Sequence, residues 1–77
     1  MIYRAFITKL PNIDSNIFEV RVPYLEDNTG VEMKFPAVLC SQPGIYNGYK
    51  VGDCVFIDFD NKLMNKAVIL VKLFVNI

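Results

Sequence analysis

Apolar and polar residues alternate along much of this chain. Residues 17–24, 31–40 and 51–60 each place apolar side chains at every second position. In the first of these stretches, Glu19 and Arg21 separate three apolar residues. A period of two is typical of a strand with one face toward a core and the other toward water. The pattern therefore predicts three half-buried strands.

Two further stretches predict strands of another kind. Residues 2–9 are rich in β-branched and aromatic side chains, which favour strands. Residues 67–74 begin with five apolar residues in succession. This pattern indicates a strand that is buried on both sides, or one whose outer face meets a partner. Pro36 cannot donate a hydrogen bond to a sheet, so we expect its strand to lie at an edge or to bend there.

Short segments rich in Pro, Gly, Asn, Asp and Ser separate these five strands, and no stretch predicts a helix of useful length. Gly52 and Asp53 are expected to form a turn, because Gly permits positive φ and Asp can bond the backbone amides that follow it. We predict one all-β domain over residues 1–77, a small five-stranded OB-like Greek-key barrel. An SH3-like barrel is the alternative.

The composition suggests that the barrel does not hide all of its apolar side chains. Apolar residues make up 53% of the 77 residues, and the mean hydropathy is +0.32. A chain of this length buries only about 60% of its unfolded surface. We therefore expect another protein surface to cover part of the excess, although an apolar monomeric domain is the alternative. The net charge of zero also favours association.

Few residues offer catalytic or metal-binding chemistry. The chain has no histidine, and Cys40 and Cys54 are too few for a structural zinc site. In a reducing cytosol both cysteines are expected as thiols. Asp58 and Asp60 share one strand face, where they could hold a hard cation or act as an acid–base pair. Because no further ligands lie nearby in the sequence, we favour a solvated face, and we expect no enzyme activity and no cofactor.

The sequence has no recognisable targeting signal, so we expect the protein to be made in a cytosol. No segment approaches the roughly 20 apolar residues that span a membrane. The N-terminal residues 1–10 lack the basic leader and the continuous apolar stretch of a signal peptide. We therefore expect no membrane contact.

Binding of single-stranded nucleic acid is a second hypothesis, because OB folds often stack bases on aromatic side chains. The aromatic candidates are Tyr3, Tyr24, Tyr46, Tyr49 and Phe56, and the candidates for phosphate contact are Arg4, Arg21 and Lys34. Glu19 and Glu32 interrupt the basic residues, so no stripe of one sign forms. We therefore favour protein assembly over nucleic acid as the partner class.

Residues 49–61, with the sequence YKVGDCVFIDFDN, resemble the OB-fold domain of phage baseplate spike and tail-hub proteins, relatives of the spikes of contractile secretion systems. The matching residues are Gly52, Asp53, Val55, Ile57, Phe59 and Asp60 in this strand, Val68, Ile69 and Leu70 in the last strand, and Val20, Arg21 and Val22 in the second. Ala67 and Val71 depart from the family, which often has Pro and Gly at these two positions.

The resemblance implies a structural role in a virion tail, with synthesis in the host cytoplasm. It implies a tail-hub or baseplate protein as the partner, and a homo-oligomer that is a trimer in the family. The chain would then be a stand-alone OB piece, since no needle or lysozyme domain follows residue 77. We expect the contacts to come from the apolar last strand and from aromatic residues, which dominate interface energies. The expected interface residues are Ile45, Tyr46, Tyr49, Phe56, Val68, Leu70 and Phe74.

Overall fold

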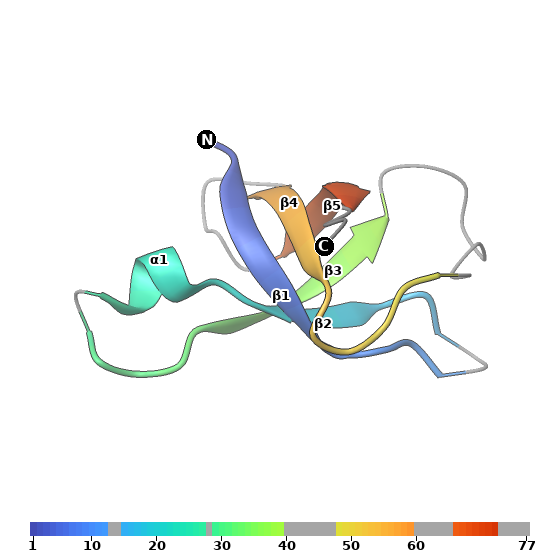
Figure 1. The fold of residues 1–77 in the computed structure, drawn as a ribbon, viewed down its shortest axis with the longest axis horizontal. Coiled ribbons are helices and arrows are strands. Elements are labelled where there is room, and N and C mark those ends of the chain that lie inside the picture. The colour runs from blue at the N-terminus through green and yellow to red at the C-terminus, as the bar shows by residue number, and fades with distance from the viewer. Residues whose placement is uncertain (13–14, 28, 40–47, 60–65, 73–77) are drawn as a thin grey trace, which may run out of the picture.

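Strands wrap around one apolar core in the computed structural model of the chain, which describes residues 1–12, 15–27, 29–39, 48–59 and 66–72 (Figure 1). Within these residues the elements are β1 (Tyr3–Lys9), β2 (Phe18–Arg21), α1 (Pro23–Glu26), β3 (Lys34–Leu39), β4 (Cys54–Phe59) and β5 (Ala67–Lys72). Each of the five predicted strands is present, at least in part.

The strands close into a barrel in the order β1-β2-β3-β5-β4, with β4 returning to β1. Neighbouring strands are antiparallel except for β3 and β5, which run parallel. A closed five-stranded Greek-key barrel is the OB-like arrangement that the sequence predicts. The prediction of an all-β fold is therefore confirmed.

The core consists of the inward-facing side chains of all five strands, together with Val22, the residue before α1. Alternation predicted this face correctly for β2, where Phe18 and Val20 are buried, and for β4, where Val55 and Ile57 are buried. The complete set of buried side chains among the described residues is Ala5, Ile7, Phe18, Val20, Val22, Ala37, Val55, Ile57, Ala67 and Ile69. None of these is polar, so the barrel interior is held by apolar packing.

Pro36 lies within β3, at a position where its missing N–H is not needed. The amide of Val22 donates to the carbonyl of Met33 at 3.0 Å, which makes this a hydrogen-bonded pair. Because such pairs alternate along an antiparallel ladder, the Glu19–Pro36 pair is non-hydrogen-bonded. The pairing of β3 with β5 starts one residue later, at Ala37. On its β5 side, β3 is therefore an edge strand at Pro36 and becomes paired from Ala37 onward. The sequence predicted either an edge or a bend at this proline, and the structure has the edge.

The second and third strands are shorter than predicted, and a helical turn lies between them. The strand expected over residues 17–24 ends at Arg21, because Pro23 takes the first position of α1. A fixed φ near −65° and a missing N–H suit Pro to that position. The turn ends where Gly30, with a φ of 69°, donates its amide to the carbonyl of Glu26 at 2.8 Å. The third strand consequently starts at residue 34 instead of 31.

We predict that Ala37→Leu destabilises the barrel by about 1–3 kcal/mol, because Ala37 is fully buried and lies opposite Phe18 on β2 and Ala67 on β5. Chemical denaturation measures the change. Val38→Leu is the control, since Val38 is only half-buried and points to the other face. Equal effects of the two substitutions would show that barrel closure does not depend on a small residue at position 37.

Candidate interaction surfaces

The outer face of β4 and β5 is apolar. The buried residues of these strands point inward, which leaves the side chains between them on the outside. We call the resulting surface the outer β4–β5 face; it consists of Phe56, Val68, Leu70 and Val71. Leu70 and Val71 keep 39% and 53% of their surface exposed, while Phe56 and Val68 are half-buried.

A β-bulge concentrates apolar side chains on this face. Phe56 of β4 pairs with Val71 of β5, whereas the next residue, Ile57, pairs with Ile69. Leu70 is thus the extra residue of β5 in this interval. A bulge interrupts the strict in-and-out alternation of a strand. Two consecutive apolar residues, Leu70 and Val71, are consequently exposed.

Charged side chains border the outer β4–β5 face. Arg4 of β1 lies opposite Phe56, and Asp58 of β4 lies opposite Val68. The carboxylate of Asp58 accepts a hydrogen bond from the N-terminal ammonium of Met1 at 3.5 Å, and both groups are exposed. Asp58 also accepts the amide of Phe59 at 2.8 Å. Asp58 is thus a surface carboxylate with a cationic neighbour. Asp60, its proposed companion, lies outside the described residues.

Ile45, Tyr46 and Phe74 of the expected interface lie outside the described residues, as does Cys40. Cys54, at the start of β4, is half-buried and is a free thiol. The expected contacts of Phe56, Val68 and Leu70 remain predictions, but the fold brings these three residues onto one face.

Tyr49, which the sequence suggested as an interface anchor, packs against the end of the barrel. Its ring meets that of Phe18 edge-on, with the centroids 5.5 Å apart. The ammonium of Lys72 lies 5.6 Å from the Tyr49 ring centroid and 3.0 Å from the Asp53 carboxylate, and it also donates to the Gly48 carbonyl. Truncation of Tyr49 would therefore disturb the fold as well as any interface.

The turn before β4 is held by Asp53. Gly52 has a φ of 96°, which other residues rarely adopt. The Asp53 carboxylate accepts the amide of Lys50 at 2.8 Å, so it bonds a preceding amide, not a following one as the sequence suggested. Burial raises the pKa of Asp53, but the hydrogen bonds from Lys72 and from the Lys50 amide outweigh it, and the pKa lies below its ordinary value.

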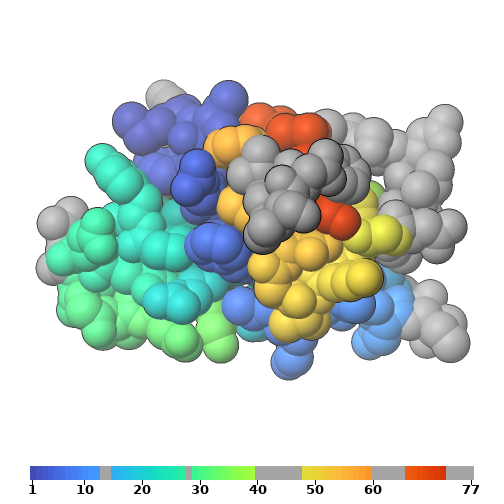
Figure 2. All heavy atoms as spheres, viewed as in Figure 1, coloured from blue at the N-terminus to red at the C-terminus, as the bar shows by residue number. Residues whose placement is uncertain are grey.

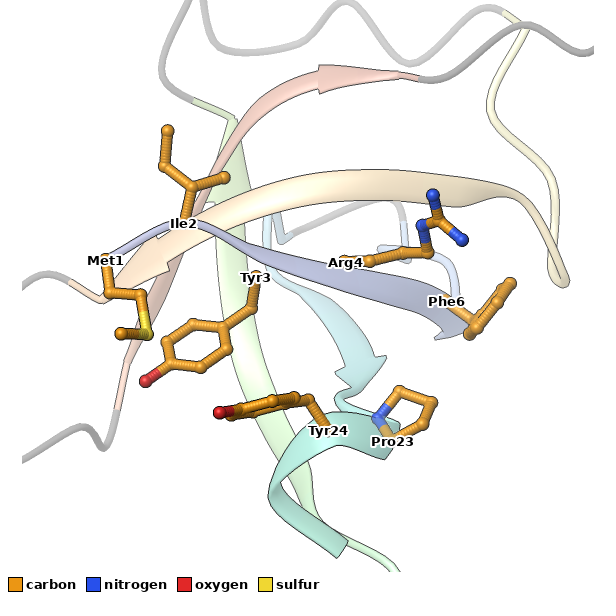
Figure 3. Close-up of a pocket in the computed structure, with 7 residues that line it drawn as sticks. All are labelled: Met1, Ile2, Tyr3, Arg4, Phe6, Pro23 and Tyr24. Atoms are coloured by element: carbon orange, nitrogen blue, oxygen red, sulfur yellow. The ribbon is translucent and has the colours of Figure 1, made fainter. Parts of the chain in front are cut away.

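A hollow lies beside β1, on the side where α1 approaches the strand (Figure 3). Its volume is about 580 Å³, and its lining residues are Met1, Ile2, Tyr3, Arg4, Phe6, Pro23 and Tyr24. The rings of Tyr3 and Tyr24 lie one above the other, with centroids 5.7 Å apart and a tilt of 46°. Figure 2 shows the two elements together at the surface, with β1 in blue and the α1 region in cyan.

The hollow was not anticipated from the sequence, because Pro23 and Tyr24 of α1 were assigned to the end of a strand and the rest of α1 to a turn. A signal was present: Pro23 followed three residues later by Glu26 is typical of a helix start. The aromatic contacts join distant segments, since Tyr3 also meets Phe59 edge-on at 5.5 Å, and Phe59 meets Phe35 at 4.9 Å. No local pattern predicts such contacts.

A polar clamp positions α1 against the barrel. The guanidinium of Arg21 donates to both carboxylate oxygens of Glu26, with Nε–Oε2 at 2.8 Å and Nη2–Oε1 at 2.7 Å. The amide of Met33 donates to the same carboxylate at 2.9 Å. The hydrogen bond from Arg21, followed by that from Met33, lowers the pKa of Glu26 from 4.5 to about 2. One carboxylate thus connects the end of β2, the helix and the segment before β3.

Two of the three basic residues proposed for phosphate contact are already paired. Arg21 is held by Glu26, and Lys34 lies 3.5 Å from Glu32 and 3.9 Å from Glu19. Arg4 makes no ion pair with the part of the chain that the structure describes. The arrangement offers a nucleic-acid backbone little continuous positive charge.

Within the described ranges, no group of three or more His, Cys, Asp or Glu side chains gathers in a way that could hold a metal ion. No helix in the same ranges is long and apolar enough to cross a membrane.

Comparisons with protein-family models, with curated proteins and with solved structures found no match to this chain. The candidate sites therefore rest on the geometry and the chemistry of the residues described above.

We predict that Glu26→Gln lowers the thermal unfolding midpoint at neutral pH, because the amide replaces the carboxylate that accepts Arg21 and Met33. The pKa of Glu26 is lower in the folded chain than in the unfolded chain, so its stabilisation is complete above about pH 4.5 and is lost as the pH falls toward 2. The difference between wild type and variant should shrink over that range. Melting curves by circular dichroism measure it.

Glu32→Gln is the matched control, since Glu32 is exposed and its ion pair with Lys34 lies at the surface. A midpoint difference for Glu26→Gln that stays constant down to pH 2 would contradict the assigned role of the carboxylate.

Proposed function

We propose that this chain is a structural assembly module that packs against another protein through its outer β4–β5 face. The observation that carries the proposal is the continuity of apolar side chains across two neighbouring strands, where Phe56 and Val71 lie opposite each other and the bulge adds Leu70. An apolar centre with charged side chains at its border is the usual anatomy of a protein interface. Arg4 and Asp58 provide that border.

The energetics favour a partner for this surface. Complete burial of a Val, Leu or Phe side chain contributes about 1.5–3 kcal/mol. Leu70 and Val71 keep 39% and 53% of their surface exposed, so roughly half of this contribution is still to be gained by association. Part of it is offset by the translational and rotational freedom lost on binding. A complex in which a partner covers this face and some of its surroundings would have a favourable net free energy of association.

We propose a phage tail baseplate or hub as the setting, with a hub or baseplate protein as the partner and a homo-oligomer, trimeric by resemblance, as the assembly. The support is the resemblance of residues 49–61 and of Val68–Leu70 to the spike and hub OB domains. These segments contribute β4 and β5, the two strands that carry the outer face. Val55 and Ile57 of the motif are core residues, so their alternation is explained by the barrel itself.

Single-stranded nucleic-acid binding is less well supported as the function. The proposed phosphate contacts of Arg21 and Lys34 would have to compete with carboxylates that already bond these side chains. Breaking the Arg21–Glu26 pair would also leave the Met33 amide as the remaining part of the clamp that holds α1. The favoured partner is therefore a protein.

We predict that the purified chain self-associates, or aggregates until a hub protein is co-expressed, and that Val71→Glu weakens the association at least about tenfold. A charge in the centre of an apolar contact is left without a partner, whereas an exposed position tolerates it in the free chain. Size exclusion with light scattering measures the mass at several concentrations.

Val31→Glu is the matched control, because Val31 is 63% exposed and lies away from the outer β4–β5 face. Two results would contradict the proposal. One is equal loss of association in both variants. The other is a monomer that binds a labelled single-stranded oligonucleotide with an affinity that falls steeply as salt rises.

A further inference from the structure

We propose that the hollow beside β1 binds an extended peptide segment of another protein, one that carries proline or other apolar residues and a single acidic side chain. The inference goes beyond the proposed function, because it concerns a surface formed by β1 and α1 that shares only Arg4 with the border of the outer β4–β5 face. It would hold even if the outer β4–β5 face made no contact.

The walls of the hollow suit an extended segment. One wall comes from the start of β1 and the other from Pro23 and Tyr24 of α1, so that the space between them follows the strand (Figure 3). The Arg21–Glu26–Met33 clamp holds α1 in place before any ligand arrives. A wall that is already ordered reduces the entropy cost of binding.

The lining favours proline and apolar side chains. Tyr3 and Tyr24 form a tilted aromatic pair, and Pro23 and Phe6 add apolar surface next to it. Aromatic-lined grooves accept polyproline-type segments, which lose little conformational entropy on binding. The backbone of such a segment makes no internal hydrogen bonds, so its carbonyls remain available. The hydroxyls of Tyr3 and Tyr24 point the same way in Figure 3 and can donate to them.

The charge of the lining selects an acidic ligand. Arg4 is the one charged side chain among the residues that line the hollow, and it makes no ion pair with the described part of the chain. The ammonium of Met1 also reaches this region, but it is already paired with Asp58. A guanidinium binds a carboxylate through two parallel hydrogen bonds. A carboxylate within the docked segment would complement Arg4.

A peptide fits this lining better than a nucleic-acid strand. Strand binding combines stacking rings with a groove of several cations, and the hollow has one basic side chain. The ring of Tyr3 is in contact with Tyr24 and also with Phe59. A base that stacked between the two tyrosines would have to separate them, whereas a proline can pack against Tyr24, which is 65% exposed, and leave the pair in contact.

The test uses fluorescein-labelled peptides of about ten residues, built from alternating Pro and Leu with one Asp that is moved along the sequence. Fluorescence anisotropy measures binding to the full chain. At least one Asp peptide should bind, and the same peptide with Lys in place of Asp should bind at least about tenfold more weakly. Tyr24→Ala should reduce binding about tenfold or more, and Arg4→Glu should reverse the preference between the Asp and Lys peptides.

Two controls match these variants. Val31→Ala removes an apolar side chain as exposed as Tyr24, at 63% against 65%, but outside the hollow. Lys9→Glu makes the same charge reversal at the far end of β1. Both should keep wild-type binding, as should Val71→Glu, which separates this site from the outer β4–β5 face. Circular dichroism verifies that each variant is folded.

Three results would overturn the inference. The first is that no Asp peptide binds. The second is that Asp and Lys peptides bind equally, or that Arg4→Glu leaves the preference unchanged. The third is that a labelled oligothymidine binds more tightly than every Asp peptide and loses its binding in Tyr24→Ala and Arg4→Glu, which would assign the hollow to nucleic acid.

Discussion

The parallel pairing of β3 with β5 is the constraint on which the rest of the structure depends, because it closes the barrel. Ala37 and Ala67 face each other at the start of this pairing, and both are fully buried. Larger side chains at these positions would force the strands apart. An open sheet would leave β3 and β5 as edges with unpaired backbone groups. Closure instead pairs those groups within the chain and leaves the outer side chains at the surface.

Closure also explains why apolar residues reach the surface. A barrel of five short strands encloses little volume, and the described core contains small as well as large apolar side chains. The outer residues of β4 and β5 therefore cannot be buried inside the barrel. Outside the strands, polar contacts set the geometry: Glu26 holds α1 and Asp53 holds the turn before β4. Exposed ion pairs stabilise weakly, but the bonds to backbone amides fix positions.

Local patterns in the sequence were sufficient for the fold class and for most of the core. Alternation identified the buried faces of β2 and β4, since a strand with one buried face has a period of two. The run of apolar residues at the start of β5 suggested a strand buried on both sides or one whose outer face meets a partner; Leu70 and Val71 are exposed, so the first alternative is wrong and the second stays a prediction. The pattern failed at residues 22–33, where Pro23 starts a helical turn within a stretch that alternates like a strand. Three residues of the outer β4–β5 face, Phe56, Val68 and Leu70, were named from the sequence, whereas the hollow beside β1 was not predicted.

The sequence by itself determined that five strands form and which side chains of β2 and β4 face the core, because both follow from the local spacing of side chains. The tertiary structure decided which strands became neighbours and in which register. Strand register set Phe56 opposite Val71 and brought Arg4 alongside them. Helix α1 brought Tyr24 to Tyr3, twenty-one positions apart in the chain. Such contacts depend on barrel closure, which brings together segments that are distant in the chain, and on the Glu26 clamp, which holds α1 against the end of β2.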